Sequence, residues 1–537
     1  MAKGYRPVRR DQPFLLPPDM REWLGAGHPV WLVIDAVRQL DTSAAHRLRR
    51  TGGRGTAGYD PDMLVTLLVW AYACGVTSSR RIEAACRTDV AFRVICAGDV
   101  PDHVTVARFR AGFPLLAGEL FMQVLVLCAR LGMGKLGTVA LDGMKIAASA
   151  SKDANRTEEG LRKLAAARVA EHAAADAAED ELFGQGRRGD ELPPGTGSRA
   201  ERIAAALRDL EAERIAAEQA RDQAGEASAQ AFRQRRAAGQ PPGTPPAAQA
   251  VALAEETLAK ARAQRAAQLG ELEKRYAAGQ VRRGKAAGVE DYCRVRAARA
   301  AVGRARARQD KAAAAAARRH KDRKGPGPVR NITDPHSRLM PVRGGGFIQG
   351  YNAQNLTSSD GLIIATQLTQ DTTDTRWFGP MLRAAQDAAT IISAHHPPAA
   401  DPAHNSIGLI LADAGYCSEA NLTIPGPDRL IAAGKHHNLE KAARGQETTS
   451  PQTAGPATTA MRERLKTTDG ITAYRQRGHI AETPHGNIKH NMRFRKLTMR
   501  GLAKATAEWT FTATVHNLLK ALAADRLTSH ALTTPAS

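Results

Sequence analysis

The sequence is poor in aromatic residues, in paired cysteines and in long apolar runs. Phe, Trp and Tyr make up only 4% of its 537 residues, so part of the chain is expected to be Ala-rich helix. None of the six cysteines forms a Cys-x-x-Cys pair, which argues against a zinc site or a redox motif. The longest apolar run, 63–76, is too short to span a bilayer, and the first residues lack the apolar core of a signal peptide. These absences predict a cytoplasmic protein with no membrane partner.

Acidic residues are also scarce relative to basic ones. The chain has 76 Lys and Arg against 54 Asp and Glu, which gives a formal net charge of +22. So basic a balance indicates a polyanionic partner, and nucleic acid is the commonest. The basic residues are spread along the whole chain, so the charge alone does not locate a binding surface.

Composition and periodicity divide the chain into segments. They are a helical N-terminal domain (1–135), the start of an α/β domain (136–154), an Ala/Arg/Glu-rich helical insertion (155–328), the rest of the α/β domain (329–525) and a flexible tail (526–537). The short N-terminal helices resemble a helix-turn-helix DNA-binding unit, although an ordinary helical bundle with solvated arginines fits the same pattern. The basic residues that would contact DNA there are Arg80, Arg81, Arg108 and Arg110.

The insertion has coiled-coil-like spacing. Ile203, Leu207, Leu210 and Ala217 follow four- and three-residue steps, with Arg214 in the one place that lacks an apolar residue, which predicts a helical hairpin. Pro- and Gly-rich stretches at 191–198, 237–249 and 324–331 are expected to be partly disordered joints.

Two stretches repeat one arrangement, an apolar strand that ends in an aspartate followed by glycine. TVALDGMKIAASAS (138–151) contains Asp142, and LILADAGY (409–416) contains Asp413. Taken alone, Asp142 is most simply a turn residue or a helix cap. Two such strands in one α/β sheet, however, can place both carboxylates at the same edge, where ligands bind. Carboxylate oxygens are the ligands that Mg²⁺ prefers, and a pair of cations can serve phosphoryl transfer.

A third carboxylate is expected from the segment 473–501. Glu482 lies there in a strongly basic run, whereas a solvated helix face normally mixes the two signs of charge. We therefore favour Glu482 as a metal ligand whose neighbours hold phosphates. Glu508, in the sequence AEW, is the alternative third acid.

These motifs, taken in their order, resemble the DDE transposases of bacterial insertion sequences, in the branch with a Tyr–Arg–Glu–Lys signature. The stretches YDPDMLVTLLVWAYACGV (59–76), NITDPHSRLM (331–340) and YRQRGHIAETPHGNIKHNMRFRKL (474–497) also match that family. The resemblance implies an α/β RNase H-like catalytic fold with an all-α N-terminal domain and a long helical insertion. This chain has four residues between Arg477 and Glu482 where the usual signature has three, and His485 stands where Phe is common.

The resemblance also implies a reaction and its participants. Asp142, Asp413 and Glu482 would bind two Mg²⁺ ions, or Mn²⁺, for DNA strand cleavage and strand transfer. The partners would be double-stranded DNA, as terminal inverted repeats and target, and a second copy of the chain in the DNA complex, in the cytoplasm or on the nucleoid of a bacterium. A catalytically silent DNA-binding descendant and a related RNase H-like nuclease are the alternatives. The residues expected to contact DNA are Tyr474, Arg477, Lys489, Lys145, Arg493 and Arg495.

Overall fold

The computed structural model describes residues 19–47, 58–167, 199–239, 247–280, 284, 286–322, 328–342, 344–397, 405–433 and 455–524. The chain forms two compact units. The first comprises residues 1–155, 194–202 and 330–537, and the second comprises 156–193 and 203–329. The predicted joint at 191–198 and the predicted tail at 526–537 lie outside the described residues, as do residues 240–246 and 324–327 of the other two joints.

The first unit begins with short helices, as the sequence predicts. Asp60 caps α3 by accepting a hydrogen bond from the backbone N–H of Asp62, and Pro61 occupies the first helical turn. α7 is the one described helix of a length and apolarity that could cross a membrane, but half of it is buried, with Phe113 and Val124 in the core beside α17. The N-terminal elements are η1 (Met20–Glu22), α1 (Pro29–Arg38), α2 (Ser43–Arg47), α3 (Pro61–Ala73), α4 (Ser79–Thr88), α5 (Val90–Ile95), α6 (His103–Ala111) and α7 (Phe113–Arg130).

A mixed sheet follows, with the strand order β4-β5-β1-β7-β8 and with β6 paired to β5. β1 runs parallel to β7, and β7 runs parallel to β8, whereas β5 is antiparallel to β1, β4 and β6. The sequence 346–370 predicts two strands around the Ser-Asp-Gly turn at 359–361, and β5 and β6 confirm them. The strands are β1 (Thr138–Ala147), β4 (Arg338–Pro341), β5 (Phe347–Ser358), β6 (Ile363–Thr369), β7 (Leu409–Ala412) and β8 (Asp428–Ile431).

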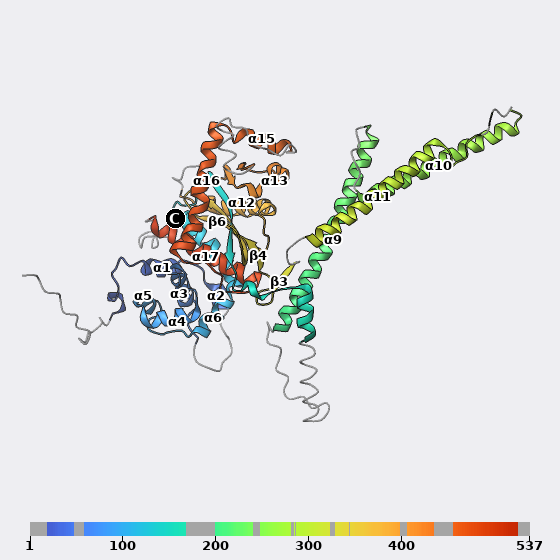
Figure 1. Cartoon of the computed structure of the whole chain (residues 1–537). Coiled ribbons are helices and arrows are strands. Elements are labelled where there is room, and N and C mark those ends of the chain that lie inside the picture. The colour runs from blue at the N-terminus through green and yellow to red at the C-terminus, as the bar shows by residue number, and fades with distance from the viewer. Residues whose placement is uncertain are drawn as a thin grey trace, which may run out of the picture. The chain divides into compact units, whose positions relative to one another are not determined.

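Helices cover both faces of this sheet (Figure 1). Leu141 of β1 packs in the core that includes α7, α12 and α17, whereas its neighbour Ala140 packs in a second core with α15 and α16. Because successive side chains of a strand point to opposite faces, Asp142 shares the face of Ala140 and Gly143 shares that of Leu141. The helices and short turns here are η3 (Thr375–Trp377), α12 (Phe378–His395), η5 (Ala414–Tyr416), α13 (Glu419–Thr423), α15 (Pro456–Arg464), α16 (Thr468–Gly486), η6 (Asn487–Asn491) and α17 (Leu502–Ala523).

Two expectations about local structure are wrong. β1 does not end at Asp142, which pairs with Asn355 of β5 while the strand continues to Ala147. The parallel pairing of β1 with β7 does end there, at Leu141 and Ala412, so Asp142 and Asp413 each follow the last pair. The second error concerns residues 445–469, whose polar, Gly-, Thr- and Pro-rich composition predicts a loop but which contain α15, packed against α13.

The second unit is helical where it is described. α11 (Cys293–Asp322) packs along α10 (Ala247–Ala277), and it buries Val295, Ala298 and Val302 at steps of three and four. In α9 (Arg199–Ala237), Ile203 and Leu210 are buried, but Ala217 is exposed, so the predicted apolar seam ends early. The remaining short elements are η2 (Lys152–Ala154), β2 (Asn155–Thr157) and β3 (Val329–Asn331), of which the two strands pair with each other.

Candidate active site

One guanidinium holds the two predicted aspartates together at the edge where β7 ends. Nη2 of Arg477, on α16, lies 3.1 Å from Oδ1 of Asp142 and 3.8 Å from Oδ2 of Asp413. Each carboxylate also accepts a backbone hydrogen bond, at 3.0 Å from the N–H of Gly143 to Asp142 and at 2.9 Å from the N–H of Gly415 to Asp413. The parallel pairing of β1 and β7 thus brings together two acids that are far apart in the sequence.

Burial controls the charge of this pair. It raises the pKa of Asp142 to about 6, against the opposing effect of Arg477, and it also raises the pKa of Asp413. Burial alone would lower the pKa of the Arg477 guanidinium, but the nearby Asp142, Asp413 and Glu482 outweigh burial and raise it. Two partly buried carboxylates therefore share the guanidinium of Arg477.

The pKa of Asp142 predicts a pH-dependent stability. A folded-state pKa of about 6, above the ordinary 3.8, means that ionised Asp142 destabilises the fold above pH 6, by roughly 3 kcal/mol at most. In metal-free buffer at pH 7.5, Asp142→Asn should therefore melt a few degrees above the parent chain, and this difference should shrink as the pH falls from 6 towards 4. Thermal melts in EDTA across this range measure the effect. An offset that does not change with pH would contradict the assignment.

The other signature residues on α16 and η6 lie beside this pair. Tyr474 is buried and donates a hydrogen bond to the carbonyl of Ala412, the last residue of β7, and burial raises its pKa to about 12. Lys489 is half-buried, and burial lowers its pKa against the opposing effect of Asp142. Tyr474 thus fixes the end of β7, whereas Lys489 is a partly desolvated cation near Asp142.

His485 stands where the family usually has Phe, and it lies beside Asp142. Its Nδ1 is 3.7 Å from Oδ2 of Asp142, and its Nε2 is hydrogen-bonded to the side-chain amide of Asn355 at 3.0 Å. Burial, together with the nearby positive charge of Lys489, lowers the pKa of His485 to about 3, so the ring is neutral at pH 7. It therefore fills space beside Asp142 without adding a positive charge.

Glu482 lies on the same helix but apart from the two aspartates. It is exposed, and it makes no hydrogen bond or salt bridge to a described residue. It precedes His485 by three residues, which places the two side chains on one face of α16. The third predicted acid is thus near the pair, within range of Arg477, but not gathered with it.

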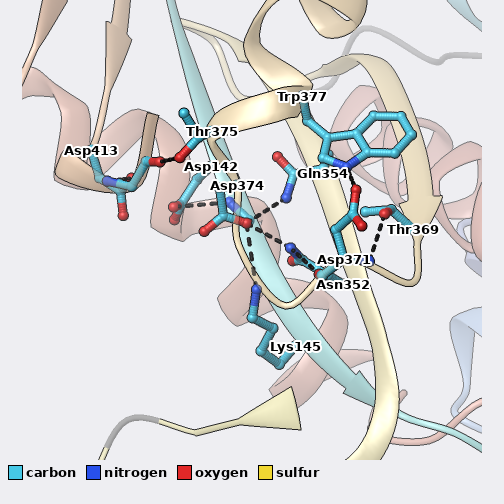
Figure 2. A network of polar contacts seen from close by, with 12 residues as sticks. Asp142, Lys145, Asn352, Gln354, Thr369, Asp371, Asp374, Thr375, Trp377 and Asp413 are labelled. Atoms are coloured by element: carbon cyan, nitrogen blue, oxygen red, sulfur yellow. Dashed lines mark hydrogen bonds and ion pairs between the residues drawn. The ribbon is translucent and has the colours of Figure 1, made fainter. Parts of the chain in front are cut away.

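The structure instead brings an acid that the sequence analysis missed. Asp374, in the turn between β6 and α12, accepts hydrogen bonds on Oδ1 from Asn352 at 2.6 Å and from Gln354 at 2.7 Å (Figure 2). The ammonium of Lys145 lies 3.4 Å from the same oxygen. The one signal for Asp374 in the sequence is its place in the short turn between the end of β6 at Thr369 and η3, which begins at Thr375.

A basic cleft of about 470 Å³ lies in the same unit. Ser78 and Ser79, at the start of α4, line it together with Arg493 and Arg495. Arg80, Arg81 and Arg108 are exposed on α4 and α6. These predicted DNA-contacting residues are therefore accessible to a ligand.

Arg110 also lines this cleft, but its side chain is almost fully buried and engaged within the protein, which argues against its predicted DNA contact. Its guanidinium is buried and donates to Oε1 of Glu508 and to the hydroxyl of Tyr72, each at 2.8 Å, and to the side chain of Thr498. Glu508 is fully buried and also accepts the backbone N–H groups of Thr498 and Met499. This ion pair ties α6 to α17, so it also removes Glu508 as the alternative third acid.

Among the described residues, His46, Asp60 and Asp62 form the group of potential metal ligands whose donor atoms lie within 4.8 Å of one another. All three are exposed. Asp62 accepts from His46 and Thr42, and Asp60 caps α3, so the group has a structural explanation. A cavity of about 690 Å³ near these residues, lined by Trp31, lies on the N-terminal helices rather than at the aspartate pair.

Models of two protein families match segments in the N-terminal and C-terminal parts of the chain. A family model described as a transposase domain of unknown function matches residues 18–112, and a model described as a transposase DDE domain matches residues 438–522. The second match contains Tyr474, Arg477, Glu482 and Lys489, and together the two models cover about a third of the chain. No curated protein and no solved structure matches the chain. Both matches are to transposase domains, and together they support an insertion-sequence DDE transposase.

Proposed function

We propose that this protein is an active transposase that cuts DNA at the terminal inverted repeats of an insertion sequence and joins the freed ends to a target. The observation that carries the proposal is the shared contact of Arg477 with Asp142 and Asp413, on the helix that bears Glu482. The DDE domain implies an RNase H-like fold, and the mixed sheet with helices on both faces is consistent with it.

The residues at the site fit divalent cations, which DDE transposases generally use. The donors are carboxylate oxygens, the hard ligands that Mg²⁺ and Mn²⁺ prefer, and Asp142 and Asp413 have one guanidinium between them. We propose that Asp142, Asp413 and Glu482 hold two such ions. When bound, these ions would stabilise charge on the attacking and leaving oxygens of a phosphoryl transfer.

The proposed reaction consists of two displacements at phosphorus. In the first, a water oxygen bonds to phosphorus and the P–O3′ bond breaks, which leaves a 3′-hydroxyl and a 5′-phosphate. In the second, that 3′-hydroxyl bonds to a phosphorus of target DNA, and the target's own P–O3′ bond breaks. The protein contributes positioning and charge rather than a covalent intermediate.

The basic residues would hold the DNA backbone during these steps. Lys489 lies near Asp142, and Lys145 lies beside Asp374, so both ammonium groups lie where a scissile phosphate would be bound. Nε of Arg477 is buried without a partner in the described part of the chain, and it can donate to a phosphate oxygen. Further phosphate contacts would come from Arg493 and Arg495 in the cleft and from the exposed Arg80, Arg81 and Arg108. A homodimer of this chain would hold the two ends of the insertion sequence together.

A DNA assay separates the alternatives. Purified protein is incubated with Mg²⁺, a labelled DNA fragment that carries the gene's own flanking sequences, and a target plasmid. The proposal predicts cut flanks and label covalently joined to the plasmid. Cut flanks that never join would indicate a nuclease, and a retarded band without cutting in Mg²⁺ or Mn²⁺ would indicate a silent DNA-binding protein. Either result would overturn the proposal.

A further inference from the structure

Asp374 is held in one orientation by donors that contact only one of its two carboxylate oxygens. Asn352 and Gln354, on the same face of β5, and Lys145 of β1 all approach Oδ1 (Figure 2). Gln354 is itself oriented, because its Oε1 accepts from the hydroxyl of Tyr416. Oδ2 of Asp374 makes no hydrogen bond within the described residues. The network on Oδ1 therefore fixes the orientation of the carboxylate and leaves Oδ2 available to a ligand.

Two glycines leave the room around this carboxylate. A Cβ on Gly143 would lie 2.6 Å from Oδ1 of Asp374 and 3.1 Å from Oδ1 of Asn352, so any other residue there would displace the network. A Cβ on Gly415 would lie 3.2 Å from Oδ2 of Asp374 and 3.0 Å from Oδ1 of Asp413. The free oxygen of Asp374 and one oxygen of Asp413 thus flank the same small space.

A neutral oxygen near this group also lacks a partner. Asn352 is fully buried, and its amide nitrogen donates to Asp374 and to the carbonyl of Asp371. Its Oδ1 has no hydrogen-bond partner in the described part of the chain and points to the space that Gly143 leaves open. A buried acceptor without a donor is costly unless a ligand satisfies it, and a cation or a cation-bound water would do so.

An ion pair with Lys145 does not account for this arrangement. Lys145 contacts Oδ1, whereas Oδ2 is turned towards the carboxylate of Asp413, which repels it. Two carboxylate oxygens that flank one space are stable together when a divalent cation lies between them.

We propose that Asp374 is a further cation-binding carboxylate of this protein, which shares a divalent cation with Asp413. Asn352 supplies a neutral oxygen at the space that Gly143 leaves beside Oδ1 of Asp374, where it would accept from a water on the cation. The inference rests on the proposed function, because the cation would be one of those that serve DNA cleavage. It brings Asp374 to the site from the face of β1 that carries Gly143 and Lys145, which is opposite to the side chain of Asp142.

The test is Mn²⁺ binding by the full-length chain without DNA, measured by isothermal titration calorimetry and by the electron paramagnetic resonance of free Mn²⁺. Asp374→Asn should weaken Mn²⁺ binding by about tenfold or more. The matched control is Asp387→Asn, which removes one exposed carboxylate from nearby α12 and should leave the affinity unchanged. Affinity of Asp374→Asn within twofold of the parent would overturn the proposal.

A second variant keeps the test valid if Asp374→Asn folds poorly. Gly415→Ala leaves every charge in place but puts a methyl group in the space between Asp374 and Asp413. It should also weaken Mn²⁺ binding by about tenfold, with an unchanged circular dichroism spectrum. Undiminished Mn²⁺ affinity in Gly415→Ala would likewise contradict the shared cation.

The DNA assay distinguishes failure of this inference from failure of the proposed function. Mn²⁺ binding that depends on Asp374, in a chain that never cuts DNA, would support the cation site and reject the transposase. DNA cutting and joining by the parent chain, with Mn²⁺ affinity unchanged in Asp374→Asn, would support the transposase and reject the cation site.

Discussion

Replacing Asp142 by asparagine is expected to reduce DNA strand cleavage by roughly a thousandfold or more. The variant keeps the shape of the side chain but removes a charged ligand at the edge where β7 ends. A bound metal contributes several kcal/mol to the stabilisation of a phosphoryl-transfer transition state, and about 4 kcal/mol corresponds to a factor of a thousand. Cleavage of the labelled flanking fragment under single-turnover conditions measures the loss.

DNA binding by the same variant should persist. The proposed phosphate contacts in the basic cleft and on α4 and α6 do not involve Asp142, so a gel shift with the flanking fragment should show an affinity close to that of the parent. Asp387→Asn is again the matched control and should cut at the parent rate. Cleavage within tenfold of the parent by Asp142→Asn would reject Asp142 as a metal ligand.

The second large effect is on stability, at the buried pair of Arg110 and Glu508. Arg110→Met removes the cation and leaves the carboxylate of Glu508 fully buried, beside Tyr72 and Thr498. Breaking one side of a buried ion pair typically costs about 3–5 kcal/mol. In a chain of this size, that loss should lower the melting temperature by roughly 10 °C. Differential scanning fluorimetry measures it.

Two further variants show whether the role of Arg110 is structural. The double variant Arg110→Met with Glu508→Gln removes both charges and should recover part of the lost stability. Arg108→Ala, at an exposed neighbouring position of α6, should leave the melting temperature unchanged. An unchanged melting temperature in Arg110→Met, together with weaker DNA binding, would restore Arg110 as a DNA contact.

Local patterns in the sequence predict the secondary structure well where one face of an element is buried. Asp60 and Pro61 mark the start of α3, and the apolar run before Asp413 marks β7. The alternative explanation of Asp142 as a turn residue fails, because β5 pairs with β1 beyond that position and keeps the strand extended. That partner strand lies more than 200 residues away, so local sequence carries no sign of it.

The site was also predictable only in part, because its contacts join residues that are far apart in the sequence. Asp142 and Asp413 repeat one motif, and the pairing of two parallel strands makes them neighbours. Asp374 lies in a turn, and only the tertiary structure shows that Gly143 and Gly415 leave room for its carboxylate. Arg110 was misread because a buried and an exposed arginine have the same sequence pattern, and its partner Glu508 lies at the other end of the chain.

The central claim, that Asp142 and Asp413 bind the metal for DNA cleavage, is tested most directly by exchanging a carboxylate for a thiol. Asp413→Cys replaces a hard oxygen ligand by sulfur, which Mg²⁺ binds poorly and Mn²⁺ accepts more readily. The account predicts that this variant cleaves the flanking fragment at a background rate in Mg²⁺ and recovers substantial cleavage in Mn²⁺. Parent-like cleavage in Mg²⁺, or inactivity in both metals by a folded variant that still binds DNA, would contradict it.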